Sequence, residues 1–279
     1  MMQPIRRFLT VFLAIGMFGI GQPAWANPML AAQPTYADLA GWADQANMVI
    51  KAKVKRQIEV PPERAPGLQP DRVRLYIEAE TIALISGASP IGEAFSYLVD
   101  VPRRANGKPP KLKKQEVLIF ALAVPGRPGM VQLVSTAAQL PASPPLEQRL
   151  RPILQELASA DAPPKVTGVR DALPVFGNLV GESETQIFLS TQDDSPASIT
   201  IVRRPGQDPR WGVSFTEIVD QSAAPPAPES IAWYRLACSL PGRLPGGAVL
   251  ASSIDQRRLA EQDYALVLRD LGPCNRLMS

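Results

Sequence analysis

The chain has 279 residues and no histidine. Without an imidazole it cannot form a Ser-His-Asp or Cys-His catalytic site, and a histidine-ligated zinc site is excluded as well. Cysteine is nearly absent, since only Cys238 and Cys274 occur. Two thiols are too few for a thiolate metal site or a C-x-x-C redox motif. The sequence therefore predicts no metal site, no cofactor and no catalytic residue of these classes.

A basic, then apolar, then small-residue segment opens the sequence. Arg6 and Arg7 precede an uncharged apolar stretch from Phe8 to Gly21, and Ala24-Trp25-Ala26 follows. This order is typical of a secretory signal peptide, with cleavage expected after Ala26. The stretch is shorter than the ~20 apolar residues of a membrane span, and no later stretch is apolar enough to be one. We therefore expect residues 1–26 to be removed, leaving a periplasmic or secreted protein without a transmembrane segment.

In such an oxidising compartment, Cys238 and Cys274 are expected to form one disulfide. Each cysteine follows a predicted helix, because residues 229–238 end at the first and the Gly272-Pro273 stop precedes the second. Two buried free thiols are the alternative.

The remaining composition favours short strands over nucleic-acid binding. Removal of residues 1–26 leaves 27 basic and 26 acidic side chains, a net charge of +1. A general nucleic-acid binder carries a larger positive charge. Twenty-eight of the 30 prolines remain, roughly twice the usual ~5% frequency, and so much proline favours short strands joined by stiff turns.

The first part of the mature chain alternates between apolar and polar residues. Thr35 and Asp38 fit a capping box at the start of a helix over Tyr36 to Gln45. Period-two alternation then predicts two strands, with a bend or bulge at Thr81 to Ile85, and three further segments complete a set of five. The five segments are 49–60, 73–85, 95–101, 116–124 and 130–134, of which 116–124 is apolar enough to be central.

Five strands at this spacing predict a small, strongly bent barrel. Residues 37–134 resemble the OB-fold-like domains of exported proteins, including netrin-like and tissue-inhibitor-of-metalloproteinase-like modules. The resemblance lies in the Ala37-Asp38 opening, the alternating first strand, a second strand ending near Gly87, and an apolar strand before a hairpin. It implies an OB-like β-barrel domain over residues 27–134 and, by fold analogy, peptidase inhibition.

Residues 135–165 are predicted to be a helical linker. Ser143-Pro144 is a good helix start, but Pro152 predicts a kink or a late start at Arg151. Residues 166–279 then form an α+β C-terminal domain.

In that domain, strands over 185–191, 198–204 and 211–219 are joined by turn-forming residues, which favours an antiparallel meander. Two short helices follow, at 229–238 and between a Ser253/Gln256 capping box and Gly272. Residues 264–268 fit a strand as an alternative. The predicted fold class is thus α+β, mostly β, with an OB-like barrel and a meander.

Positive charge is concentrated in one part of the sequence. Residues 47–114 hold 13 basic and 7 acidic side chains, whereas residues 115–279 hold 14 and 17. The cations of one loop and of one predicted strand face are candidates for a single anion-binding surface. They are Lys51, Lys53, Lys55, Arg103, Arg104, Lys108, Lys111, Lys113 and Lys114. A solvated loop beside a solvated strand face is the alternative, and nucleic acid is not expected because no aromatic residues are interleaved.

Other polar and aromatic residues give weaker indications of a catalytic or ligand-binding site. Gly181-Glu182-Ser183 resembles the start of a nucleophile elbow, but the final glycine of G-x-S-x-G is missing. Three acidic pairs could supply a glycosidase-like acid and nucleophile, although carboxylates in turns more often cap them. These pairs are Glu182/Glu184, Asp193/Asp194 and Glu217/Asp220. Trp211, Trp233 and Tyr234 fit a ligand groove or, more often, a core.

These patterns favour an exported, non-catalytic binding or envelope-accessory protein. Its expected partner is an anionic envelope component or another protein. A histidine-independent hydrolase that uses paired carboxylates is the alternative function. Peptidase inhibition follows only from the OB-fold-like resemblance.

Overall fold

The computed structural model describes residues 33–87, 90–216 and 224–278. The expected signal peptide, residues 1–26, lies outside these ranges, and so do Glu217 and Asp220. Every helix and strand below belongs to one unit, Pro34–Ser279.

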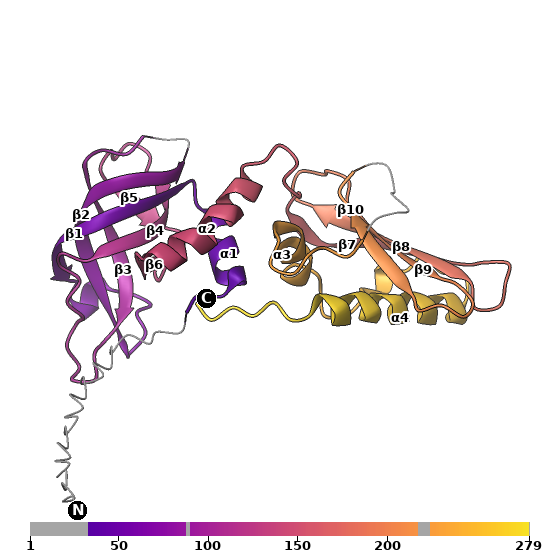
Figure 1. Ribbon diagram of the computed structural model, residues 1–279. Coiled ribbons are helices and arrows are strands. Elements are labelled where there is room, and N and C mark those ends of the chain that lie inside the picture. The colour runs from indigo at the N-terminus through magenta and orange to yellow at the C-terminus, as the bar shows by residue number, and fades with distance from the viewer. Residues whose placement is uncertain (1–32, 88–89, 217–223, 279) are drawn as a thin grey trace, which may run out of the picture. The chain divides into compact units, whose positions relative to one another are not determined.

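The first sheet is antiparallel and has six strands, in the order β3-β2-β1-β4-β5, with β6 also paired to β4 (Figure 1). The strands are β1 (Met48–Glu59), β2 (Arg72–Gly87), β3 (Ala94–Pro102), β4 (Glu116–Ala123), β5 (Val131–Leu133) and β6 (Gln139–Pro141). The sequence predicts the first five, and β4 is buried as expected. Strand β6 has three residues, too few for a period-two pattern to be recognised.

A bend in β2 is confirmed at the predicted place. The pairing of β1 with β2 shifts register at three places, and two of them, between Val49 and Ile50 and between Lys51 and Ala52, lie opposite the predicted bend. At these two shifts β2 carries one extra residue each, Ile85 and Ile82, so two bulges bend the sheet there.

The predicted barrel is not supported, because the first sheet is open. Its end strands β3 and β5 approach each other through an isolated parallel bridge between Ser96 and Met130 and a hydrogen bond from Asp100 N to Thr136 O of 2.7 Å. They form no continuous ladder in the described residues. Strand β5 has only three residues and cannot run along the nine residues of β3.

The second sheet is an antiparallel meander in the order β10-β9-β8-β7, as predicted for this region. Its strands are β7 (Val166–Phe176), β8 (Ser183–Thr191), β9 (Ser198–Arg203) and β10 (Arg210–Ser214). Strand β7 adds a fourth strand to the three that the sequence predicts. Alternate residues of β8 are buried, from Ser183 to Leu189, so one face of this sheet is covered.

Helix α1 (Tyr36–Gln45) begins with the predicted capping box. The Asp38 N–H donates to Thr35 Oγ1 at 3.1 Å, and the Thr35 N–H donates to Asp38 Oδ2 at 2.9 Å. Both side chains thus satisfy amide groups that a helix start otherwise leaves unpaired.

Helix α2 (Pro144–Leu157) corrects the prediction of a late start at Arg151, whereas the kink at Pro152 stays a prediction. The segment is one continuous helix that contains Pro152. The proline removes one helical hydrogen bond, but burial of Leu150 and Ile153 against the first sheet compensates. Because α2 packs in this core, the predicted linker segment 135–165 contributes to the core of the first sheet.

Helices α3 (Ile231–Ala237) and α4 (Ile254–Leu271) follow the second sheet. Helix α4 includes residues 264–268, so the alternative strand is wrong. The prediction of two short helices holds for α3 alone, since α4 has 18 residues. Apolar residues of α4 at positions 260, 264, 267 and 271 are buried against the sheet, which stabilises the longer helix.

The predicted disulfide is present. Cys238 follows α3, Cys274 follows α4, and the two sulfur atoms are bonded with the Cα atoms 5.0 Å apart. Beyond Cys274 the chain runs back to α1 (Figure 1), where the amides of Leu277 and Met278 each donate to Asp38 Oδ1 at 3.1 Å. The last described residues are therefore held on the first helix.

Two hydrophobic clusters form the interior. The first lies between α1, α2 and the first sheet, and the second lies between α4 and the second sheet. Trp233 of α3 packs against both clusters. Arg235 of α3 also donates to Asp44 of α1 through Nη1 and Nη2, at 2.6 and 2.8 Å. A bidentate, largely buried ion pair thus links α1 to α3.

Candidate functional site

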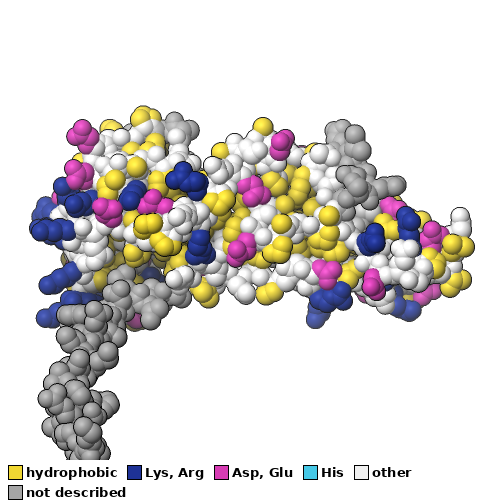
Figure 2. Space-filling model, viewed as in Figure 1, with side chains coloured by type: hydrophobic (Ala, Val, Ile, Leu, Met, Phe, Trp, Pro, Cys, Tyr) yellow, Lys and Arg dark blue, Asp and Glu magenta, His cyan; other side chains and the backbone are white. Residues whose placement is uncertain are grey.

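The nine predicted cations, here called the basic surface, lie on β1 and on the loop between β3 and β4. Figure 2 shows Lys and Arg side chains gathered over the side of the first sheet. On β1, Lys51, Lys53 and Lys55 alternate with buried Ile50, Ala52 and Val54, so all three point away from the core. The remaining six cations belong to the loop 103–114.

The loop is held in place by one polar side chain of β1 and one apolar side chain of its own. Gln57 Oε1 accepts hydrogen bonds from the amides of Leu112 and Lys113, at 2.6 and 3.2 Å. Gln57 Nε2 donates to Pro110 O at 2.8 Å. The Leu112 side chain is buried in the first cluster. The loop is therefore attached to β1 along its C-terminal part, residues 110–113.

Lys114 adopts a left-handed backbone conformation, with φ of 72°. A residue with a side chain adopts it at a cost of roughly 1–2 kcal/mol. The Lys114 N–H donates to Val54 O at 2.8 Å, and Val54 N donates to Gln115 O at 2.9 Å. These two bonds to β1 hold the strained residue at the end of the loop.

Three of the nine cations are neutralised by carboxylates. Lys51 Nζ lies 2.8 Å from Glu147 Oε1 of α2, and this contact raises the pKa of Lys51. Lys55 pairs with Glu80 at 2.5 Å, which lowers the pKa of that carboxyl group. Arg103 pairs with Glu59 at 2.9 Å. None of these three side chains is available as an unbalanced positive charge.

The other six cations form no ion pair within the described part of the chain. They are Lys53, Arg104, Lys108, Lys111, Lys113 and Lys114. Arg104 donates to Pro109 O at 3.1 Å, a bond that leaves its charge uncompensated. The nine predicted cations therefore fall into two groups: Lys51, Lys55 and Arg103 are paired with carboxylates, and the other six are not.

Of the predicted carboxylates, Glu182 and Asp193 stabilise turns. Glu182 Oε2 accepts from Leu179 N at 3.3 Å in the turn between β7 and β8. Asp193 Oδ1 accepts from Ser195 N at 3.3 Å, and hydrogen bonds from Ser195 lower the pKa of Asp193. Glu184 Oε1 accepts from Gln186 Nε2 at 2.9 Å. A glycosidase acid needs a raised pKa, and hydrogen bonding moves that of Asp193 the other way.

The aromatic candidates belong to the core. Trp211 is buried in the second cluster and donates from Nε1 to Asp270 Oδ2 at 3.0 Å. Trp233 donates from Nε1 to Leu271 O at 2.8 Å. Tyr234 is buried beside the first cluster, and its burial raises the pKa of the phenol. These contacts support the core interpretation over the ligand groove.

A polar cluster that the sequence did not predict lies between β8, β9 and α4. Asp263 of α4 has no exposed surface. Its Oδ2 accepts from Thr185 Oγ1 at 2.5 Å, and its Oδ1 lies 2.7 Å from Nε and 2.6 Å from Nη2 of Arg203. Desolvation raises the pKa of Asp263. The sequence carries one sign of this cluster: the charged residue Asp263 falls among positions 260, 264 and 267, which form the buried stripe of α4.

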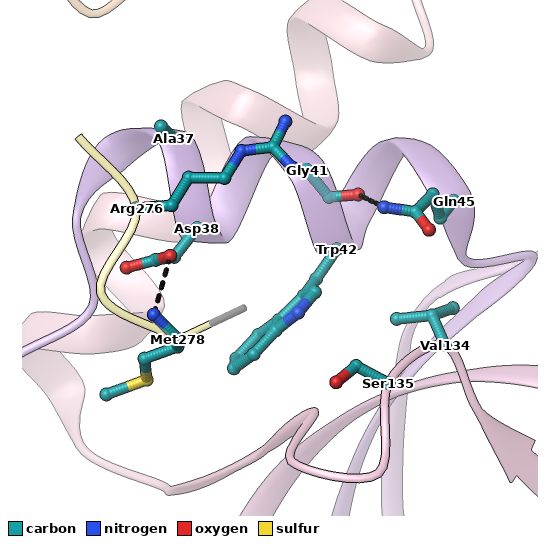
Figure 3. Close-up of a pocket in the computed structure, with 9 residues that line it drawn as sticks. All are labelled: Ala37, Asp38, Gly41, Trp42, Gln45, Val134, Ser135, Arg276 and Met278. Carbon is teal, nitrogen blue, oxygen red and sulfur yellow. Dashed lines mark hydrogen bonds between the residues drawn. The ribbon is translucent and has the colours of Figure 1, made fainter. Parts of the chain in front are cut away.

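A hollow of about 120 Å³ lies beside α1, below the C-terminal segment (Figure 3). Trp42 of α1 points into it, Val134 and Ser135 close one side, and Arg276 and Met278 close the other. Asp38 already accepts hydrogen bonds from Thr35, Leu277 and Met278. The Arg276 guanidinium lies over the Tyr234 ring, 5.7 Å from its centroid. The polar groups at this hollow are thus used to hold the C-terminal segment.

Comparison with known proteins assigns no family. No protein-family model matches the chain, and no curated protein matches it. Among the described helices, none combines the length and hydrophobicity needed to cross a bilayer. The described His, Cys, Asp and Glu side chains form no group of three or more that could hold a metal ion.

Proposed function

We propose that the protein is exported and binds anionic envelope material through its basic surface. Six of the nine cations form no ion pair in the described residues, and these unpaired cations are the main support for the proposal. Each lysine near an anionic bilayer contributes about 1 kcal/mol of binding free energy. Five lysines and one arginine on a small surface are enough for stable association with such a membrane.

The contacts that hold the loop 103–114 in place favour a binding role for its cations over a loop that is merely solvated. Like charges repel, so a loop with no acid between Arg103 and Lys114 gains nothing from being ordered unless other contacts hold it. Here Gln57, the burial of Leu112 and the paired backbone at Lys114 hold it. An ordered array of cations loses less side-chain and backbone entropy on binding than a mobile one.

Export is part of the proposal. The order of residues 1–26 is typical of a signal peptide. The Cys238–Cys274 disulfide is of the kind that persists in oxidising compartments. Peptidase inhibition and the OB-fold-like resemblance stay predictions, since they depend on fold analogy.

Vesicle sedimentation tests the binding. The chain from Asn27 onward is mixed with phosphatidylcholine vesicles that contain or lack phosphatidylglycerol. We expect binding to the anionic vesicles alone, weakening as salt rises, because charges are screened over ~8 Å at physiological ionic strength. Changing Lys108, Lys111, Lys113 and Lys114 together to Ser should reduce the affinity at least about a hundredfold, at roughly 1 kcal/mol for each lysine.

A matched control separates position from net charge. Arg127, Arg204, Arg210 and Arg243 lie outside the basic surface, and their guanidinium groups make no side-chain hydrogen bond or ion pair in the described residues. Changing these four to Ser removes the same charge and should leave binding within about threefold, since charges away from the membrane-facing surface are screened. Equal losses in the two variants would contradict the proposed surface, and so would binding that ignores salt.

A further inference from the structure

A second hollow, of about 400 Å³, opens at the end of the second sheet. The turn between β7 and β8 forms its rim, with Leu179 and Val180, and Leu259 of α4 forms one wall. Small-molecule sites typically measure about 300–1,000 Å³, so its size suits a small ligand. We call this hollow the hairpin groove.

Three neighbouring residues on adjacent strands line the groove. Phe176 of β7 pairs with Ser183 of β8, and Ser183 pairs with Arg203 of β9. Residues that are directly opposite in a sheet point to the same face. Thr185 and Ile187, two and four positions along β8, are buried on this face under α4. The groove is therefore the part of the covered face that α4 leaves open.

The groove is apolar at its rim. The exposed fractions are 63% for Leu179, 99% for Val180 and 50% for Phe176. Exposure of these large apolar side chains to water costs hydration free energy. Contact with a bound apolar group would recover it. Gly177 fits the turn closely, since a Cβ there would overlap the Glu182 side chain.

Two unused hydrogen-bond donors lie beside this apolar rim. Ser183 is 6% exposed, and its hydroxyl forms no hydrogen bond within the described residues. This hydroxyl is therefore free to donate to a bound acceptor. Arg203 uses Nε and Nη2 on Asp263 and has no described partner at Nη1. Asp263, fully buried, fixes the guanidinium next to the groove.

The charges favour an uncharged acceptor. The positive charge of Arg203 is balanced by Asp263, and Glu182 adds a negative charge at the rim. A carboxylate or phosphate would be repelled by Glu182 without gaining a free cation. An ester or amide carbonyl accepts hydrogen bonds and carries no charge.

We propose that the hairpin groove binds an uncharged acyl compound, with the chain against Phe176, Leu179 and Leu259 and the carbonyl oxygen on Ser183 and Arg203. This site is separate from the basic surface and does not depend on the function proposed for it. The two share no residue.

Titration with three probes of equal chain length tests the site. Methyl octanoate, octanoate and octane are added to the chain from Asn27 onward, and the backbone amide signals of residues 176–183 are followed by NMR. We expect saturable shifts with methyl octanoate and binding at least about tenfold weaker for octane, which lacks the acceptor. Octane that binds as well as the ester would overturn the role of the polar groups. Octanoate that binds more tightly would overturn the charge argument, and no saturable shift with any probe would overturn the site.

Variants locate the binding. Ser183→Ala removes an unpartnered hydroxyl, so the fold should be retained while ester affinity falls roughly threefold to tenfold. Val180→Asp places a charge at the rim and should abolish binding, whereas Ile254→Asp places the same charge at a position that is 78% exposed and outside the groove. Ester binding that is unchanged in both Ser183→Ala and Val180→Asp would refute the proposed site.

Discussion

Each of the two sheets carries an arginine that pairs with a buried aspartate, and the two pairs differ in what remains unused. In the first sheet, Arg74 donates to Asp100 from Nε at 2.7 Å and from Nη2 at 2.8 Å, and its Nη1 donates to Pro66 O at 3.3 Å. In the second sheet, Arg203 directs both Nε and Nη2 at one oxygen of Asp263, and Thr185 takes the other oxygen. Nη1 of Arg203 has no described partner.

The surroundings of the two pairs also differ. Arg74 and Asp100 are opposite each other on neighbouring strands and point away from the core, since Val73 and Leu75 fill the inside. Asp263 lies inside the second cluster and reaches Arg203 from a helix. A buried ion pair is seldom more stabilising than apolar residues of similar volume. We infer that the first pair holds β2 and β3 together, whereas the second positions the guanidinium of Arg203 beside the hairpin groove.

Removing the arginine of each pair should have the largest effect on stability and should distinguish the two pairs most clearly. Arg203→Leu leaves Asp263 fully buried without its cation, which is expected to lower the free energy of unfolding by about 3–5 kcal/mol. Arg74→Leu leaves Asp100, whose side chain is 7% exposed and lies on the outer face of the sheet, without its cation and should cost less. Urea unfolding of both variants measures the difference.

The double variant Arg203→Leu with Asp263→Leu serves as a control, because it removes both charges. It should recover most of the stability lost in Arg203→Leu. Equal losses for Arg74→Leu and Arg203→Leu would contradict the distinction between the two pairs.

Loss of the disulfide should have the next largest effect. The closed loop spans 36 residues, which corresponds to at most about 4 kcal/mol in the chain-entropy model. Cys274→Ser should therefore lower the melting temperature and speed hydrogen exchange at Leu277 and Met278, whose amides hold the C-terminal segment on Asp38. Amides in the ladder between β8 and β9 should exchange at an unchanged rate.

Because Cys238 would be left as a free thiol, the double variant Cys238→Ser with Cys274→Ser is the matched control. The two variants should agree in melting temperature. Retention of wild-type stability in both would show that the bond contributes nothing measurable.

The smallest expected effect is a pH dependence that belongs to the second pair. Burial raises the pKa of Asp263 in the folded protein, and an aspartate in an unfolded chain has a pKa of about 3.9. Between these two values the folded state binds more protons than the unfolded state, so stability falls as pH rises from about 4 through the raised pKa.

The difference in unfolding free energy between wild type and Asp263→Asn isolates this contribution from the other carboxylates. It should decrease as pH rises over that window and level off above it. A difference that increases with pH would show that Arg203 stabilises the carboxylate more than burial destabilises it.

The sequence alone determined the features that depend on residues a few positions apart. Thr35 and Asp38 are three residues apart and form the capping box, alternation along 49–60 predicted β1, and the apolar run 116–124 predicted the buried strand β4. Pro152 misled the same reasoning about the start of α2, because burial of this helix outweighs one lost helical hydrogen bond. The disulfide followed from count and position, since only one pairing was possible.

Only the tertiary structure decided which charges are balanced. Lys51 meets Glu147 and Arg203 meets Asp263, pairs that lie 96 and 60 positions apart in the sequence. No local pattern reports such a contact, because it depends on how helices pack on sheets. The same holds for the open first sheet, since the shortness of β5 becomes apparent only where it lies beside β3. Periodicity and capping act within a few turns of the chain, whereas charge balance and the groove arise from residues that folding brings together.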